Sequence, residues 1–542
     1  MNTILFIIMR VSYLELVILK FQKKCHKIKK LITNQLFSNT VVTGDASFYY
    51  MNRLSDNSLV NIPFRMLNLN ILHQNNNFDV KGNIALEYRN RKDTDFMESS
   101  DPIDINTVLR ELYLTYYLNN GEISVGKKIY TWGNVDENSP IDILNAYDNY
   151  YLLLGPTERK LGSYSISFDY YINEGTTKFS AVYAPMHNAT RYPLNDDEYE
   201  FGLPVTILPN QILEIDKPGE IGLSIQQTFN IGDISYSYFR GYNRAPSLSG
   251  FNEYVLAEFE DGDWDVDTNP VIDLVYNYHL TEASNLGGVL LFNDFTFRFD
   301  HTEFRTKDDN GIDEYSERSC GTIGIGYGYS CNKHNLQSSP SEYKYVVNGT
   351  SAASDFDETI GEFTGNYHSY PLYQKAEYSQ QTFQIEIPLT NSYQINMQYF
   401  KYKLNSYDYI DPLDSGTEIR LPNIELPDEC VDESSNTLVI DGCLSFNPSL
   451  GAPFALLSSE TFFISLEKTI MDDDLKLTLS SLMDIDKGFG ELISFEADYD
   501  IGNGLGTIIG LTKILGDKEQ DNYTFNDLEE FSNIRFEIKY NF

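Results

Sequence analysis

The sequence predicts an all-β fold, a transmembrane antiparallel β-barrel of about 18 strands, within a range of about 16 to 20. Apolar and polar residues alternate in many short runs, which is typical of strands with one apolar face. Tight and long connections alternate between these runs. No stretch after the N-terminus approaches 18 consecutive apolar residues in this 542-residue chain, which excludes a bundle of membrane-spanning helices.

Composition narrows the classes of function. The apolar content of 42% is too high and too evenly spread for a disordered chain. The chain has 79 acidic and 40 basic residues and a formal charge of −39. Because such a surface repels phosphate, nucleic acid is not an expected partner.

Residues 1–40 differ from the rest of the chain. They are basic and partly apolar, with one acid, Glu15, and they precede an acidic body. A basic, apolar leader resembles an export signal, but here the lysines follow the apolar run Ile4–Met9 instead of preceding it. We interpret residues 1–40 as a leader, either a signal or the product of a mis-assigned start codon, and expect a single barrel over residues 41–542.

The final strand illustrates the alternation. Its apolar and polar positions are Ile534, Phe536, Ile538, Tyr540 and Phe542 against Arg535, Glu537, Lys539 and Asn541. Only alternate residues then meet lipid, which explains the low overall hydropathy, and the 40 tyrosines fit aromatic girdles at the two interfaces. An open sheet edge in lipid leaves backbone groups unpaired, so the first strand, near residues 41–51, is expected to pair with residues 534–542.

The connections fall into two length classes. The long ones are expected at 92–106, 135–162, 186–218, 245–268, 306–372 and 408–455, separated by tight turns. Short periplasmic turns and long extracellular loops are typical of bacterial outer-membrane barrels, and we therefore predict that location. A barrel of this size has a lumen wide enough for water and solutes.

Cysteines and acidic loops add two weaker expectations. Outside the leader, the cysteines form two local pairs, Cys320/Cys331 and Cys430/Cys443, which predict two loop disulfides in an oxidising compartment. Acidic loops are usually solvated surfaces, but Ca²⁺ or Mg²⁺ is an alternative. Oxygen ligands at alternate positions suit a hard cation, and the candidate ligands are Asp261, Asp263, Asp265 and Asp267. No other cofactor is expected.

The most distinctive segment spans residues 121–161. It resembles a family of largely uncharacterised, porin-like Gram-negative outer-membrane proteins, in which a strand ending in WG leads into a loop with spaced aspartates and an asparagine. The matching positions are Gly126, Lys127, Trp132, Gly133, Asp136, Asp142, Asn145 and Asp148, and Ala146 departs from the family's proline. The C-terminal Phe542 resembles the signal that barrel-assembly machinery reads. The resemblance covers about 40 residues.

In porin-type barrels an extracellular loop folds inward and narrows the lumen, and we expect the loop at 135–162 to do so. Lys127 or Lys128 opposite the loop aspartates would then create a transverse field that sorts solutes by charge. Alternation sends these two lysines to opposite faces, so one of them at most lines the pore. The alternative is that the charges pair to hold a surface loop, with Trp132 as an interface anchor.

These observations favour a channel for passive or substrate-selective diffusion of small solutes, with a preference for cations. The alternative is a non-channel adhesin or scaffold whose disulfide-bonded loops bind a partner. A barrel hydrolase is the third option, but the seven histidines are scattered and no G-x-S-x-G motif is present, so an enzyme is not expected. Expected partners are outer-membrane lipid or lipopolysaccharide, solutes and barrel-assembly machinery. A homotrimer, as general porins form, stays open.

Overall fold

A computed structural model describes most of the chain. The described residues are 39–89, 105–153, 159–193, 212–215, 217–260, 263–266, 271–308, 320–322, 329–331, 356–357, 362–363, 365–371, 373–390, 392–410, 431–432, 437–438, 446–520 and 523–542, with backbone alone in 251–274, 309–373 and 410–445. None of the helices among them is long and apolar enough to span a membrane.

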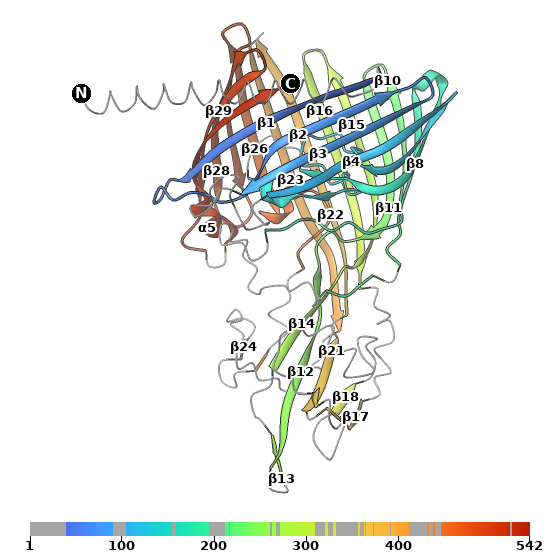
Figure 1. The fold of residues 1–542 in the computed structure, drawn as a ribbon, viewed down its shortest axis with the longest axis vertical. Coiled ribbons are helices and arrows are strands. Elements are labelled where there is room, and N and C mark those ends of the chain that lie inside the picture. Colours follow the sequence, from blue (N-terminus) through green and yellow to red (C-terminus); the bar gives the residue numbers. More distant parts are fainter. Residues whose placement is uncertain are drawn as a thin grey trace, which may run out of the picture.

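Eighteen strands form one closed antiparallel barrel (Figure 1). They are β1 (Thr40–Arg53), β2 (Pro63–Gln74), β3 (Phe78–Arg89), β4 (Ile105–Leu118), β5 (Gly121–Lys128), β8 (Ser163–Ile172), β9 (Thr177–Ala184), β10 (Glu220–Phe229), β11 (Gly232–Tyr242), β15 (Leu280–Phe292), β16 (Phe295–Lys307), β22 (Tyr373–Thr390), β23 (Tyr393–Ile410), β26 (Glu460–Ile470), β27 (Leu475–Asp484), β28 (Glu491–Gly502), β29 (Leu505–Leu515) and β30 (Asn533–Asn541). The predicted fold class and strand number are confirmed.

The barrel closes by pairing its first and last strands. The register of β1 with β30 runs from Asp45 opposite Asn541 to Arg53 opposite Asn533, as the unpaired-edge argument predicts. Every other barrel strand pairs with its neighbours in sequence order within the barrel. All backbone edges in the wall are therefore satisfied within the chain.

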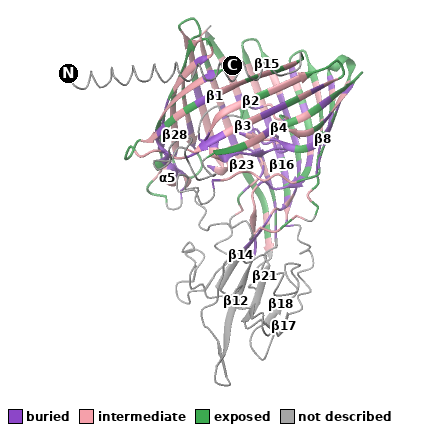
Figure 2. Cartoon of the chain, viewed as in Figure 1, coloured by how far each residue is buried: buried purple, intermediate pink, exposed green. Residues whose placement is uncertain are grey.

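The two faces of the wall follow the alternation in sequence. In β8, Tyr164, Ile166, Phe168 and Tyr170 are 41–52% exposed, whereas the serines between them are at most 5% exposed. These outward apolar residues are exposed because none of the described segments packs against them, and in a membrane this face contacts lipid. Inward polar residues such as Asp300 and Thr382 are buried because the β5–β8 connection packs against them, whereas the tips of the short turns are exposed (Figure 2).

Connections differ at the two ends of the barrel. The turn between β28 and β29 needs three residues with positive φ, Gly502, Asn503 and Gly504, and glycine is tolerated there because it has no Cβ. Such tight turns lie at the end of the barrel where the chain terminates, and the long connections lie at the other end (Figure 1).

Smaller elements belong to the long connections. A sheet formed by β12 (Ser247–Glu260), β13 (Asp263–Val266), β14 (Val271–Asn277) and β21 (Gly365–Pro371) extends beyond the barrel (Figure 1). The others are the short strands β6 (Ala146–Tyr147), β7 (Lys160–Leu161), β17 (Cys320–Thr322), β18 (Tyr329–Cys331), β19 (Phe356–Asp357), β20 (Glu362–Phe363), β24 (Val431–Asp432) and β25 (Thr437–Leu438), the 3-10 helices η2 (Asn149–Tyr151), η3 (Asn173–Gly175), η7 (Pro453–Leu456) and η8 (Leu528–Phe531), and helix α5 (Thr524–Asp527).

Two buried apolar clusters lie inside the barrel near its long-loop end. The first joins Tyr130, Ile143 and Leu144 of the β5–β8 connection to wall residues such as Phe239 and Phe304. The second joins the same connection, through Tyr151, Leu152 and Leu153, to Leu482 of β27, Ile514 of β29 and the α5–η8 segment. The β5–β8 connection thus contributes to both clusters.

Candidate functional site

The candidate site is the connection between β5 and β8, residues 129–162, which we call the lumen loop. It leaves β5 after two lysines that face opposite sides of the wall. The Lys127 ammonium lies 5.6 Å from the ring of outward-facing Tyr164, whereas that of Lys128 donates to inward-facing Ser124 at 3.2 Å. The prediction that Lys127 lines the pore is therefore wrong, because Lys127 lies on the outer face of the wall. Lys128 is the lysine that faces the lumen.

The tip of the lumen loop docks on β16 through one carboxylate. Asp300, 1% exposed, accepts hydrogen bonds from the backbone N–H groups of Asn134 (2.8 Å) and Val135 (2.9 Å), from the Asn134 side chain (2.8 Å) and from Ser139 Oγ (2.6 Å). Gly287 on β15 makes room, since an added Cβ would lie 2.2 Å from Asp300 Oδ1 and 2.4 Å from the Asn134 amide. The loop tip therefore fits directly against the wall.

The same tip also binds β22 and β23. Gln384 accepts from the Asp136 N–H at 2.9 Å and donates to its carboxylate at 2.7 Å, while Gln398 donates to the Asp136 carbonyl at 3.1 Å. Thr382 donates to the Asn138 carbonyl at 2.9 Å. The loop leaves the wall between β5 and β8, and its tip contacts β16, β22 and β23. It therefore crosses the lumen.

Two of the predicted side chains brace the loop internally. Asp142 accepts from the N–H groups of Trp132 and Gly133, both at 2.8 Å, and pairs with Lys160 Nζ at 2.6 Å. Asn145 accepts from Tyr130 N–H at 2.6 Å and donates to the Leu161 carbonyl at 2.9 Å, which ties the start of the loop to its end.

Trp132 also lies inside the barrel. A Cβ added to Gly222 of β10 would lie 3.0 Å from its indole ring, and position 222 belongs to the inward face. The tryptophan therefore packs against the inner wall, and the alternative interpretation of this residue as an interface anchor in lipid is wrong.

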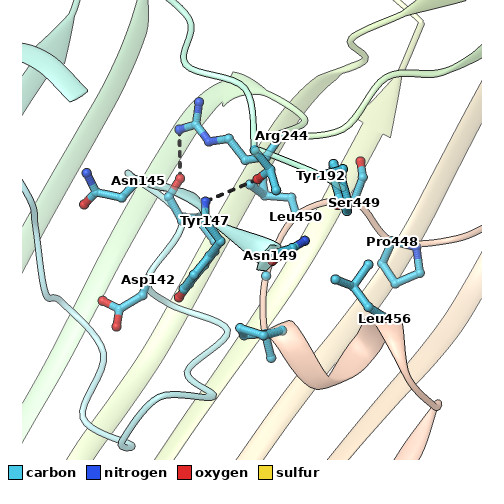
Figure 3. Close-up of a pocket in the computed structure, with 15 residues that line it drawn as sticks. Asp142, Asn145, Tyr147, Asn149, Tyr192, Arg244, Pro448, Ser449, Leu450 and Leu456 are labelled. Atoms are coloured by element: carbon cyan, nitrogen blue, oxygen red, sulfur yellow. Dashed lines mark hydrogen bonds between the residues drawn. The ribbon is translucent and has the colours of Figure 1, made fainter. Parts of the chain in front are cut away.

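A buried arginine clamps the middle of the loop to β10. Arg244 and Glu220 are each 2% exposed and form a bidentate pair, with N···O distances of 2.8 and 2.9 Å. The same guanidinium donates to the carbonyls of Ile143 (2.9 Å) and Leu144 (3.3 Å). Figure 3 shows Arg244 reaching the loop beside Asp142, Asn145 and Tyr147. A fork of fixed donors suits this simultaneous contact with carboxylate and backbone.

The end of the loop is held by a four-charge cluster. Arg191, in the β9–β10 connection, contacts Asp148 at 3.2 Å and Glu87 of β3 at 2.8 Å. Arg65 of β2 lies 3.7 Å from Asp148 and stacks over the Tyr151 ring at 4.4 Å. Both carboxylates are 1% exposed. Burial raises the pKa of Asp148 to about 6, with nearby Glu87 adding to the shift and Arg191 opposing it.

This shift predicts a pH dependence. The folded protein holds the Asp148 proton more tightly than the unfolded chain, whose aspartate pKa is about 4. The free energy of unfolding should therefore fall by up to about 3 kcal/mol as pH rises from about 4 to about 6. Denaturant titrations across this range should show a smaller change in Asp148→Asn. Identical pH profiles for both proteins would contradict the raised pKa.

A small cavity separates the lumen loop from the segment before β26. Its volume is about 30 Å³, and it is lined by Asp142, Asn145, Arg244, Ser449 and Leu450, among others (Figure 3). One or two water molecules fit in such a space.

The predicted residues do not converge on one point. Asp136, Asp142, Asn145 and Asp148 each hold a different part of the lumen loop. Sequence reasoning missed Asp300, Glu220 and Arg244, and the only signal for the first two is that each is a charged residue at an inward position of a strand.

Other predicted sites are described in part. Cys320 and Cys331 are opposite each other in the β17–β18 register, while Cys430 and Cys443 lie outside the described residues, so both disulfides stay predictions. Asp261 and Asp267 also lie outside them, and the backbone of Asp263 and Asp265 in β13 is paired with that of Glu260 and Glu258 in β12. Where side chains are described, no three His, Cys, Asp or Glu residues are placed to hold a metal ion.

The closed wall, apolar outside and polar inside, defines a class of protein: the transmembrane β-barrels of bacterial outer membranes. No model of a known protein family matches the chain, and no curated protein matches it. The predicted family resemblance of the 121–161 motif is therefore still a prediction.

Solved structures of outer-membrane proteins align with most of the chain. OccAB2 of Acinetobacter baumannii is 8% identical, with 93% of this chain and 98% of that chain covered and a TM-score of 0.43. OccK8 (OprE) of Pseudomonas aeruginosa is 10% identical over 93% and 98%, with a TM-score of 0.43. The outer membrane channel DcaP of A. baumannii is 11% identical over 93% and 97%, with a TM-score of 0.36. Because these identities and TM-scores are low, the fold assignment depends on the strand pairing of this chain alone.

Proposed function

We propose that the protein is a porin-like channel that lets small solutes cross the outer membrane and favours cations. The observation that carries this proposal is the chemistry of the inner wall near the short-turn end. Inward acids there outnumber inward bases: Asp45, Asp79, Glu122, Asp169, Asp233, Glu386, Glu467, Glu496, Asp498, Asp500 and Glu537 against Lys81, Lys128, Lys178, Arg298, Lys476, Arg535 and Lys539. Such a wall concentrates cations.

In this proposal the lumen loop is the constriction. Three of its acids contribute little net charge, because Asp142 pairs with Lys160, Glu137 with Arg159 and Asp148 with Arg191. The unpaired excess on the barrel wall then sets the field that solutes meet. The loop sets the size limit, because it crosses the lumen and is bonded at both sides.

Planar-bilayer recording tests the proposal. The folded, full-length chain should give discrete conductance steps, and liposomes that contain it should swell in small uncharged solutes. Protein unfolded by heating before reconstitution is the control and should give neither signal. A folded barrel that conducts no ions and admits no solute would overturn the channel proposal.

Replacing two inward acids should weaken the cation preference. Asp45→Asn combined with Asp498→Asn removes two charges from the inner wall, so the ratio of cation to anion permeability should fall roughly two- to three-fold. Reversal potentials in a salt gradient measure this ratio. The matched control is Glu303→Gln on the outer face of β16, which should leave it unchanged.

A second function is supported by the packing inside the barrel. Two apolar clusters and a loop with many anchors occupy the long-loop end. These features fit a closed scaffold that presents extracellular loops to a partner. The same recordings separate the two functions, since a scaffold conducts nothing even when folded.

A further inference from the structure

A charged patch lies on the outer wall of the barrel at its long-loop end. It spans β11, β15, β16, β22, β23 and the start of β26. We call it the outer charged patch, and its members are Arg240, Glu282, Glu303, Arg305, Lys307, Lys375, Glu377, Lys401, Lys403, Asp408 and Glu460. The patch has slightly more bases than acids, in a chain with 79 acids and 40 bases.

Strand alternation places these residues on the outside. Asp300 and Thr302 of β16 bind the lumen loop, so Glu303 and Arg305 point to the opposite face. Thr382 of β22 also binds that loop, which places Lys375 on the outer face. Arg305 is 75% exposed and Lys375 is 55% exposed.

The patch lies beyond the part of the wall that crosses the hydrocarbon. Strand β22 has 18 residues, whereas a tilted strand crosses with about 9–11. Counted from Thr390 at the short turn, the crossing ends near residue 380, after the outward apolar positions Phe383, Ile385 and Ile387. Lys375 and Glu377 then lie at the level of the headgroups of the outer leaflet.

The charges are arranged in a row across neighbouring strands. Arg240 is opposite Glu282, Glu282 opposite Arg305, and Arg305 opposite Glu377. The ion pairs at the two ends of this row are 3.4 and 3.3 Å long and use the Nε atom of each arginine. A guanidinium has five donors, so these pairs orient the arginines and leave donors for an anion.

We propose that the outer charged patch binds phosphate-bearing headgroups of lipids in the outer leaflet. Three observations converge on this partner: the patch is richer in bases than the chain as a whole, it lies at headgroup level, and its two arginines are oriented in one row by Glu282 and Glu377. The alternative occupant of the outer charged patch is a second copy of the chain, and the test distinguishes it from lipid. The inference does not depend on the channel proposal, since a closed scaffold would sit in the same membrane.

The test measures binding of diphosphorylated lipid A to the full chain in nonionic micelles, by native mass spectrometry. Each basic residue near a charged headgroup contributes about five-fold to affinity, so Arg305→Gln, Lys375→Gln and Lys403→Gln together should weaken binding about 100-fold. Glu303→Gln should strengthen it about five-fold. Dephosphorylated lipid A should bind with the weak affinity of the triple variant.

The matched control is Lys513→Gln. Lys513 is an exposed outward lysine on β29, opposite Ile493 and near the same end of the barrel, but outside the patch. The Lys513→Gln variant should bind lipid A with an affinity within about two-fold of that of the unaltered protein. Equal binding of phosphorylated and dephosphorylated lipid, or a triple variant that binds as the parent does, would overturn the proposal. The proposal would also be overturned by spectra in which the patch substitutions change the amount of dimer and leave lipid binding unchanged.

Discussion

Replacing Arg244 with glutamine should free the middle of the lumen loop and destabilise the barrel by about 3–5 kcal/mol. The change leaves Glu220 as a buried carboxylate without its bidentate partner, and it removes the donors to the carbonyls of Ile143 and Leu144. The loss of a partner from a buried pair is costly because the remaining charge stays desolvated. Denaturant titration in detergent measures the stability, and bilayer recording measures the conductance, which should rise and become noisier.

The matched control is Arg240 of β11, an exposed arginine four positions before Arg244. Arg240→Gln removes an exposed ion pair with Glu282 and should change stability by less than about 1 kcal/mol, with no change in conductance. An Arg244→Gln protein that is as stable as this control would show that the clamp contributes no net stability.

Replacing Asp300 with asparagine should undock the tip of the lumen loop. The carboxylate accepts four hydrogen bonds, and an amide of the same size keeps one acceptor oxygen and points an NH₂ group at the remaining donors. A hydrogen bond to a charged group contributes about 1.5–3 kcal/mol to stability, and an unsatisfied buried donor costs a similar amount. We therefore expect the free energy of unfolding to fall by about 3 kcal/mol. The single-channel conductance should increase, because the tip no longer spans to β16.

Asp233→Asn is the control for this experiment. Asp233 is an inward aspartate of β11 that makes no hydrogen bond to the described part of the lumen loop, so its replacement should leave the loop in place. A conductance that rises equally in both variants would point to lost wall charge as the cause. An unchanged Asp300→Asn protein would contradict the docking role.

The wall could be predicted from sequence because strand alternation is a local property. Ile534, Phe536 and Ile538 alternate with charged residues whatever else the chain does, and lipid outside requires that pattern. The inner contacts could not be predicted in the same way. The bond between Asn134 and Asp300 joins residues 166 positions apart, and alternation shows only that Asp300 faces inward. Among many inward polar residues, nothing in the sequence selects the one beneath the loop.

The predicted motif had a similar limit. The spacing of Asp142, Asn145 and Asp148 suggested a set of charges around one passage, but the first two brace the loop and the third binds Arg191. The base that pairs with Asp142 is Lys160 at the end of the same loop, whereas the base that contacts Asp148 is Arg191 in the β9–β10 connection. The pattern identified the right loop, and the counter-charges decide what each residue does in it.

The seam between β1 and β30 has a consequence for how the barrel assembles. All other wall contacts join strands that follow one another, whereas this one joins residues near positions 45 and 541, with backbone bonds between Gly44 and Phe542 at its end. Contacts so distant in sequence form late, after the hairpins have already curled the sheet. Until then the nascent sheet has two edges with unpaired backbone groups, and such edges can pair with other chains and cause aggregation.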